Sequence, residues 1–283
     1  MDAATVCRMQ AVTAEAWRVE GRYAPLHVGD VAWMRYQHPG REDEWRVRLW
    51  QRDGRDVAWA WLRVPDSLLF SCVLPDVRTE LLDEVMEWAD ARVVEVQSTD
   101  EISRSIMERR GYGLDAEQRV LAVHHRELVD EPPVEPPPGY RLRTVRPDDL
   151  SVRVELHQVV WAPSRVTEDS YRDVQAAWPY RSELDCVVEA PDGRLAAYCL
   201  AWLDEDNRAG ELEPVGTHPD FRRLGLGSAV CRFALRRLEE EGATQAMVYA
   251  VADDPENPGP KALYESIGFV ETSRFLRYVT DLP

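Results

Sequence analysis

A glycine-containing turn between a strand and a helix is the feature of this sequence that most restricts its fold. In residues 211–228, ELEPVGTHPDFRRLGLGS, a strand-like run is followed by Arg222, Gly225 and Gly227, and an apolar-periodic segment then runs to about Glu241. Glycines let the backbone approach a ligand closely, and the start of the next helix offers free N–H groups and a positive dipole end. The segment therefore predicts a loop that binds an anion such as a pyrophosphate.

The spacing of this loop excludes two other phosphate-binding motifs. A dinucleotide-binding fingerprint needs a third glycine where Val230 stands, and a P-loop needs a Gly-Lys-Ser/Thr sequence that does not follow. Further along the chain, residues 245–252 have the pattern of a buried strand, and a polar turn and the segment KALYESIGFVET come next.

The two motifs together resemble the acyl-CoA signature of the GNAT family of N-acetyltransferases. In that family a strand, an Asn-containing turn, a short helix with Leu-Tyr and then Gly-Phe follow the phosphate loop. The corresponding residues here are Asn257, Leu263, Tyr264, Gly268 and Phe269. The resemblance implies that acetyl-CoA is the cosubstrate.

Composition and charge limit the class of protein further. Of the 283 residues, 45% are hydrophobic and 30% are charged, as in soluble globular proteins. No run approaches the roughly 18 apolar residues of a membrane span, and the first ten residues lack the apolar core of a signal peptide. The net charge of −17 disfavours nucleic acid as a partner. The five cysteines form no C-x-x-C pair, and the histidines show no metal spacing. We therefore expect a cytoplasmic protein without a disulfide framework or a bound metal.

A proline-rich segment divides the chain. Residues 131–139, EPPVEPPPG, cannot join a helix or a central strand and predict a semi-rigid linker. The expected domains are residues 1–130 and residues 140–283. In the second, the patterns predict an α/β fold with a mixed sheet, in the order strand, two helices, three strands, helix, strand, helix, strand.

The first half repeats the later part of this order. Strand patterns between residues 44 and 74 lead to LPDVR at 74–78, which parallels HPDFR at 218–222. The chain then enters a helix without a glycine, and Met107 stands where the second copy has Tyr264. We therefore expect two tandem GNAT-like domains, of which the first is degenerate and does not bind acyl-CoA. This arrangement resembles mycothiol synthase in architecture.

The resemblance assigns the residues that would hold acetyl-CoA. The pyrophosphate would lie on N–H groups of the loop and the helix start, and the pantetheine would lie along the strand end like an additional strand. Pro214 cannot donate a ladder hydrogen bond, which predicts a bulge or a splay nearby. The expected contacts are Val215, Gly216, Thr217, Arg222, Arg223, Leu224, Gly225, Leu226, Gly227, Ser228 and Asn257.

Acetyl transfer also needs a base and a proton donor, because an ammonium group is not a nucleophile and the departing thiolate needs a proton. Glu211 and Glu213 lie two residues apart and share one face of the strand. Glu211 falls where several GNAT enzymes carry the base and is the first choice, with Glu213 as the second. Tyr264 matches the family's proton donor. Cys186 and Cys199 have no evident base beside them and are interpreted as packing residues.

The expected activity is the direct transfer of an acetyl group from acetyl-CoA to a small amine. Two alternatives stay open: a protein or peptide acetyltransferase that acts on lysine or an N-terminus, and a non-catalytic acyl-CoA-binding regulatory module. We expect no nucleic acid or membrane partner, and the sequence is compatible with a monomer. The amine is expected to enter between the two domains, near the segment from Trp161 to Tyr171.

Overall fold

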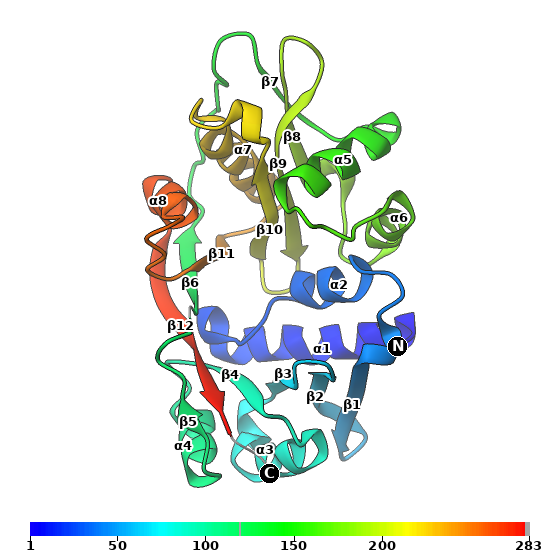
Figure 1. Cartoon of the computed structure of the whole chain (residues 1–283), viewed down its shortest axis with the longest axis vertical. Helices are drawn as coiled ribbons and strands as arrows, with labels where there is room; N and C mark the ends of the chain where they lie inside the picture. The colour runs from blue at the N-terminus through cyan, green and yellow to red at the C-terminus, as the bar shows by residue number, and fades with distance from the viewer. Residues whose placement is uncertain (119, 281–283) are drawn as a thin grey trace.

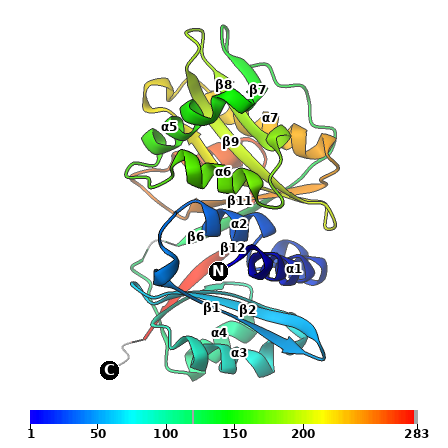
Figure 2. The same ribbon diagram turned by 90° about the vertical axis from the view of Figure 1, so that its right-hand side faces the viewer.

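The chain folds into two α/β units, which lie one above the other in Figure 1 and are seen from the side in Figure 2. A computed structural model describes residues 1–118 and 120–280, so the end of the second predicted domain, at residue 283, lies outside the described residues. Among the described residues, no helix has the length and apolar character that crossing a bilayer requires.

The N-terminal unit begins with two helices that pack on a sheet. Asp2 caps the first helix by accepting a hydrogen bond from the N–H of Thr5, and Pro75 occupies the first turn of the third helix. The elements are α1 (Ala3–Glu20), α2 (Val28–Tyr36), β1 (Trp45–Arg52), β2 (Arg55–Arg63), β3 (Leu68–Val73), α3 (Pro75–Ala89), β4 (Val93–Gln97), α4 (Glu101–Arg109), β5 (Gly113–Leu114) and β6 (Leu121–Glu127).

The C-terminal unit has the element order that the sequence predicts. The Thr167 side chain caps α6, and the turn at 191–193 joins β8 and β9 as a hairpin. The elements are β7 (Arg141–Thr144), α5 (Leu150–Val160), α6 (Glu168–Ala176), β8 (Asp185–Glu189), β9 (Leu195–Asp204), β10 (Ala209–Thr217), α7 (Leu226–Glu240), β11 (Gln245–Val251), α8 (Gly259–Ser266) and β12 (Val270–Val279). The mixed α/β fold class is therefore confirmed.

The two units share one continuous sheet, because each receives a strand from the other half of the sequence. The strand order is β1-β2-β3-β4-β12-β6-β11-β10-β9-β8-β7, and β5 pairs with β12 at one side. Strand β6, which precedes the proline-rich segment, lies between β11 and β12 in the C-terminal unit. The second half of β12 pairs with β4 and β5 in the N-terminal unit. The domain limits read from the sequence stay a prediction, and β6 and β12 cross them in space.

An apolar cluster also holds helix α2 against the C-terminal unit. Trp33 of α2 packs with Trp202 of β9 and Tyr171 of α6, and all three side chains are almost completely buried. Burial of such large aromatic side chains stabilises an interface by roughly 2 kcal/mol each. Because α2 is fixed in this way, its polar residues have a defined position beside β10.

Beneath α5 and α6, a buried ion pair fixes these two helices on the sheet. The Nε of Arg153 donates to Asp185 at 3.1 Å, and the Tyr171 hydroxyl donates to the same carboxylate. The guanidinium also lies 3.8 Å from the centre of the Tyr198 ring. Tyr171, which the sequence suggested as part of an acceptor pocket, therefore belongs to the packed interior.

Candidate active site

The predicted anion-binding loop lies between the end of β10 and the start of α7. Gly225 precedes the helix with φ of +77°, a conformation that favours glycine, and a Cβ added there would meet no atom within 4 Å. Gly227 in the first turn is needed for space, since its Cβ would lie 3.2 Å from Thr217 Oγ1 and 2.8 Å from Leu263 Cδ1. The loop, the strand end and helix α8 therefore meet at one place.

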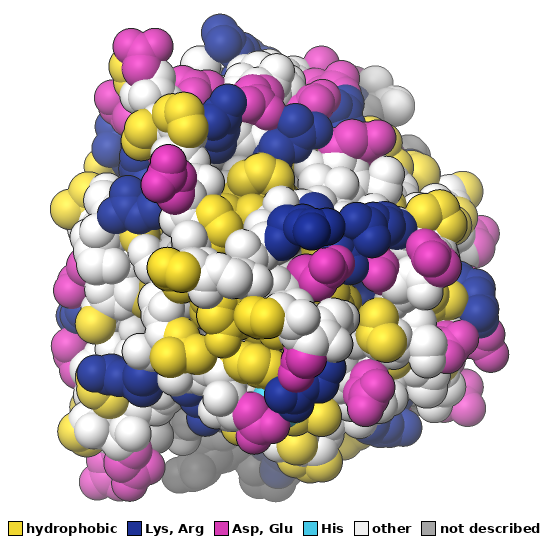
Figure 3. Space-filling view, turned by 90° about the horizontal axis from the view of Figure 1, so that it is seen from above, with side chains coloured by type: hydrophobic (Ala, Val, Ile, Leu, Met, Phe, Trp, Pro, Cys, Tyr) yellow, Lys and Arg dark blue, Asp and Glu magenta, His cyan; other side chains and the backbone are white. Residues whose placement is uncertain are grey.

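Cationic side chains surround the same loop. Arg222 and Arg223 are exposed, and their side chains have no ion-pair partner among the residues that the structure describes. Arg223 also has a positive φ of 67°, an unusual conformation for a residue with a side chain. Seen from above, basic and acidic side chains are interspersed over this end of the molecule (Figure 3). Local positive charge is thus available in a protein of net charge −17.

The predicted irregularity at Pro214 is confirmed. The pairing of β10 with β9 shifts register between Leu212 and Val215. The parallel pairing of β10 with β11 covers Ala209–Glu211 against Gln245–Met247 and stops there. Backbone groups of β10 beyond Leu212 are therefore released from the β11 side, so an extended ligand can take the place of a strand.

The other residues predicted to contact acetyl-CoA differ in their exposure. Val215 and Thr217 are half-buried, as is Glu213 two residues earlier, whereas Gly216 turns toward Tyr198, whose Cε1 would lie 2.7 Å from an added Cβ. The remaining loop residues divide into exposed Leu224, buried Leu226 and half-buried Ser228.

On the opposite side of the splay, α8 carries Tyr264. This side chain is 7% exposed and packs edge-on against Phe269 with ring centres 6.1 Å apart. Burial raises the pKa of the Tyr264 phenol well above its usual value, and negative charge on Cys231, Cys199 and Glu213 would raise it further. The phenol is therefore protonated at neutral pH. Asn257 lies in the exposed turn before α8, where its N–H donates to Asp254 at 3.2 Å.

An unexpected third carboxyl group joins the two predicted glutamates. Asp30 of α2 lies beside Glu211 and Glu213, and carboxyl oxygens of the three groups lie within 4.8 Å of one another. Asp30 Oδ2 accepts hydrogen bonds from the His27 N–H at 2.6 Å and from the Tyr249 hydroxyl at 3.0 Å. The spacing would allow a metal ion, but three carboxyl groups at this distance can equally be held together by shared protons.

The burial of Glu211 beside Asp30 and His27 favours a proton on its carboxyl group. His27 Nε2 lies 3.1 Å from the Ala209 carbonyl, so it carries the ring proton, and Nδ1 accepts from the Gly29 N–H at 3.1 Å. Burial lowers the pKa of His27 and, together with Asp30 and Glu213, raises the pKa of Glu211. Glu211 Oε2 lies 3.1 Å from Nδ1. Among the described residues, neither oxygen of Glu211 has a hydrogen-bond partner, so the buried carboxyl group favours its neutral, protonated form.

A cavity of about 230 Å³ opens onto this acidic cluster from the N-terminal unit. It reaches Asp30, Glu213 and Tyr249, whereas Glu211 does not line it. Nor do the residues from Trp161 to Tyr171 line it, so this cavity lies on another side of the cluster than the sequence suggested. Burial raises the pKa of Glu213 well above its usual value, and Asp30 raises it further.

The cysteines of the hairpin are packing residues, as expected. Cys186 and Cys199 lie opposite each other on β8 and β9 and are completely buried. Burial raises the pKa of both thiols well above the usual value, so neither provides a thiolate nucleophile at neutral pH. This geometry gives no support to a covalent acyl-enzyme.

Sequence reasoning missed Asp30, His27 and Tyr249. Asp30 stands three residues after His27, and the two form a reciprocal cap at the start of α2. The segment HVGD could have indicated that helix start, but nothing in it indicates a contact with a strand in the other half of the chain. The place of His27 and Asp30 in the site follows from the packing of α2 on β9 and β10, whereas Tyr249 lies on β11.

The model of the acetyltransferase (GNAT) family matches residues 153–269. A mycothiol acetyltransferase of Streptomyces coelicolor is 33% identical over 109 residues, which cover 38% of this chain and 34% of that protein. A mycothiol acetyltransferase of Saccharomonospora viridis is 26% identical over 213 residues, 71% of this chain and 68% of that protein. The aligned part thus spans between about a third and two thirds of these relatives.

Solved structures with the same fold cover nearly the whole chain. A GCN5-related N-acetyltransferase from Sphaerobacter thermophilus aligns with a TM-score of 0.66 at 18% identity, over 99% of this chain and 93% of that one. A tandem GNAT protein from the clavulanic acid biosynthesis pathway aligns with a TM-score of 0.66 at 16% identity, over 99% and 95%. The chain has the fold of tandem GNAT proteins, and residues 153–269 match the model of the GNAT acetyltransferase family.

Proposed function

We propose that this protein is an acetyl-CoA-dependent N-acetyltransferase that acts on a small amine in its C-terminal unit. One observation carries the proposal: the glycine loop, the splayed end of β10, protonated Tyr264 and the carboxyl cluster around Glu213 meet at one place. Acetyl-CoA is the cosubstrate of the GNAT family, and the relatives named above are acetyltransferases.

Acetyl-CoA binds with its pyrophosphate at the N-terminus of α7 and its pantetheine along β10. The free N–H groups from Arg223 to Ser228, the helix dipole and two exposed arginines attract the pyrophosphate. The N–H groups of Val215 and Thr217 on the splayed strand are available to the pantetheine amides and to the thioester carbonyl oxygen.

Glu213 is the group that receives the proton of the amine. Glu213 lines the cavity, while Glu211 does not line it and is already protonated because of its burial. The raised pKa of Glu213 brings its affinity for protons closer to that of an amine, which suits a base that works near neutral pH. This reverses the order of preference for the two glutamates that sequence position suggests.

Each bond that forms or breaks in the transfer has an assigned proton donor or acceptor. The substrate ammonium gives one proton to Glu213, the amine nitrogen attacks the thioester carbonyl carbon, and a C–N bond forms. When the tetrahedral intermediate collapses, the C–S bond breaks and the Tyr264 hydroxyl gives its proton to the departing thiolate. The new amide nitrogen loses a second proton, which returns to the site, and one proton in total goes to solvent.

Turnover of acetyl-CoA, measured as release of free thiol, tests the proposal. The acceptors would be alkylamines, amino sugars, polyamines and short peptides with a free lysine or N-terminus. We expect release with at least one small amine. Saturable binding of acetyl-CoA without thiol release would favour a non-catalytic module, and release with peptides alone would favour a protein acetyltransferase.

A further inference from the structure

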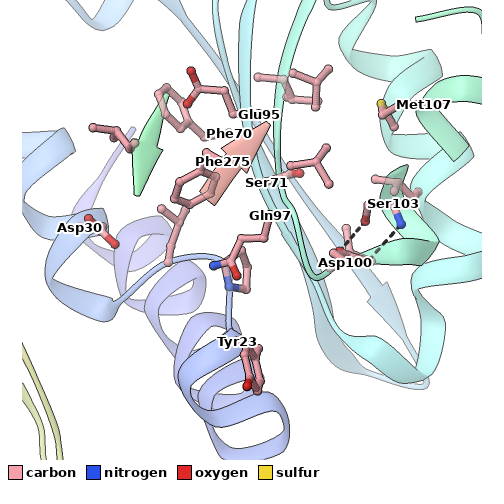
Figure 4. Close-up of a pocket in the computed structure, with 18 of the residues that line it drawn as sticks. Tyr23, Asp30, Phe70, Ser71, Glu95, Gln97, Asp100, Ser103, Met107 and Phe275 are labelled. Carbon is pink, nitrogen blue, oxygen red and sulfur yellow. Dashed lines mark hydrogen bonds between the residues drawn. The ribbon is translucent and has the colours of Figure 1, made fainter. Parts of the chain in front are cut away.

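The cavity that reaches the acidic cluster occupies the place in the N-terminal unit that corresponds to the donor site of the C-terminal unit. Strands β3 and β4 pair in parallel at Leu68 and Leu69 with Val93 and Val94 and then separate, as β10 and β11 do. The cavity lies in this splay, and Figure 4 shows Phe70, Ser71, Glu95 and Phe275 around it.

The polar groups that could hold a phosphate in this cavity are engaged elsewhere. Arg78 donates to Glu20 and to the Val73 carbonyl, and its Nη1 lies 3.2 Å from Asp100. Helix α3 starts directly at Pro75, without a glycine loop before it. No free cation therefore faces an anionic ligand in this part of the described structure.

The other polar side chains of the cavity are mostly satisfied by the protein itself. The Gln97 amide donates to the Ala24 carbonyl and accepts from Ser273. Asp100 caps α4 by accepting from the N–H and the hydroxyl of Ser103. The rest of the wall is largely apolar and includes Leu69, Met107 and Phe275. A ligand with many hydroxyl groups would leave them unpaired here, which is unfavourable.

The charge and the size of the cavity define what it accepts. Asp30 and Glu213 present carboxyl groups at the end where the acetyl group would arrive, so that end suits a cationic amine. A volume of about 230 Å³ exceeds the roughly 150 Å³ of an engineered apolar cavity that binds benzene in another protein. One ring or a chain of several methylenes fits.

We propose that the splayed cleft of the N-terminal unit binds the apolar body of the acceptor, so that the substrates are amines with an aliphatic or aromatic body rather than amino sugars. This proposal rests on the proposed acetyltransferase function and adds the substrate class. It gives the N-terminal unit, which lacks a phosphate loop, a direct part in acceptor recognition.

The test is a series of acceptors from methylamine to hexylamine, with phenethylamine and glucosamine for comparison. We expect kcat/KM to rise about fourfold for each methylene that becomes buried. Ser71→Phe, which fills the cavity, should lower the ratio of kcat/KM for hexylamine over methylamine at least tenfold. Thr79→Phe, on the exposed face of α3, is the matched control and should keep the ratio of the wild type.

The outcomes separate the two proposals. A flat series, a preference for glucosamine, or an unchanged ratio in folded Ser71→Phe would overturn the cavity assignment and leave acetyl transfer intact. Absence of turnover with every amine would overturn the proposed function; calorimetric binding of hexylamine to the wild type would then still support the cavity. If Ser71→Phe does not fold, the acceptor series and the hexylamine titration, both measured on the wild type, test the cavity assignment instead. A second acetyl-CoA that hexylamine displaces would assign the cavity to acyl-CoA instead.

Discussion

The starts of α3 and α7 occupy corresponding places in the two units, yet they have opposite chemistry. At α7, Gly225 and Gly227 leave room for a ligand, and Arg222 is exposed. At α3, the helix begins immediately after the strand, and Arg78 folds back to pair with Glu20. One helix start is open to an external anion, while the other is neutralised by the protein's own carboxylates.

The same contrast extends to the residues that we propose to transfer protons. When Pro75 is aligned with Pro219, Leu69 holds the place of Glu213. When Gly111 is aligned with Gly268, Met107 holds the place of Tyr264. Both replacements are apolar and line the cavity of the N-terminal unit. The N-terminal unit lacks the residues of an acetyl-CoA site. It nevertheless contributes Asp30 and a cavity beside the carboxyl cluster of the C-terminal unit.

Strand exchange links the units further. Because β6 completes the upper sheet and β12 continues into the lower one, neither unit has all of its strands within one half of the sequence. We therefore expect that cutting the chain in the proline-rich segment would expose unpaired strand edges in both halves.

The largest effect is expected for the base, which the first unit lacks. Glu213→Gln keeps the shape of the side chain but removes its proton affinity, so kcat/KM should fall by roughly 10²- to 10⁴-fold. The loss should be greatest at low pH, where the amine is most protonated, and should diminish toward the pKa of the amine. Measurement of kcat/KM from pH 6 to 10 checks this, and a larger loss in Glu211→Gln would return the role to Glu211.

Arg78→Met tests whether the arginine of the first unit is structural. Its removal leaves Glu20 and Asp100 without their partner in a largely buried place, which should lower the free energy of unfolding by about 2–4 kcal/mol. Urea denaturation measures this loss. The number of acetyl-CoA molecules bound per folded chain should not change, and a lower number would contradict the comparison.

The proton donor is the second difference between the units. Tyr264→Phe preserves the ring that packs on Phe269 but removes the hydroxyl, so kcat should fall by roughly 10²-fold. The affinity for acetyl-CoA, measured by calorimetry, should stay within about twofold, since the ring contributes packing in both proteins. An unchanged kcat in a folded variant would show that Tyr264 only packs.

Arg222→Met should have a smaller effect, in contrast to Arg78→Met. The exposed Arg222 adds charge beside the loop, and its loss should weaken acetyl-CoA binding several-fold, by about 1 kcal/mol. The difference between wild type and variant should shrink as salt is raised, because exposed charges are screened. The unfolding free energy should stay the same, and a large loss of stability would mean that Arg222 is structural too.

The acidic cluster should give a pH dependence of stability that the exposed surface does not. The pKa of Glu211 is raised above its usual 4.5 by burial and by Asp30. A carboxyl group with a raised pKa stabilises the fold fully below about pH 4.5, and this contribution is lost as the pH rises through the folded value.

Glu211→Gln removes that titration and keeps the size and shape of the side chain. Its unfolding free energy relative to wild type should therefore increase between pH 5 and pH 9, as measured by urea denaturation. Glu80→Gln, at an exposed position of α3, serves as the control. If both variants follow the wild type at every pH, Glu211 is not protonated in the way that its burial beside Asp30 implies.

Much of the fold could be predicted from local patterns. The strand–loop–helix at 209–240 follows from glycine chemistry and helix periodicity, and the bulge follows from Pro214. The pairing of β12 with β4 could not be predicted, because the register of strands that are distant in sequence depends on the packing of the whole molecule. The position of Asp30 beside Glu211 could not be predicted for the same reason, since it depends on how α2 packs against a distant strand.

Only part of the candidate site could be predicted from the sequence, because the rest depends on contacts between distant segments of the chain. The loop residues and Tyr264 belong to motifs of fixed spacing, so their proximity could be expected from the sequence. The choice between Glu211 and Glu213 depends on Asp30 and on the cavity, most of which belongs to the other half of the chain. The sequence-based choice of Glu211 used only its distance along the chain from Thr217, which says nothing about contacts with the N-terminal half.

We expect the C-terminal unit to bind acetyl-CoA and the N-terminal unit not to bind it. Titration calorimetry of acetyl-CoA onto the whole protein tests this expectation most directly. One molecule should bind per chain; Gly225→Glu, which introduces strain and a repelling carboxylate into the loop, should weaken binding by at least roughly 10²-fold. Thr79→Glu, at the corresponding helix start of the first unit, should bind as the wild type does. Two equivalent sites, or undiminished binding in Gly225→Glu, would contradict the account.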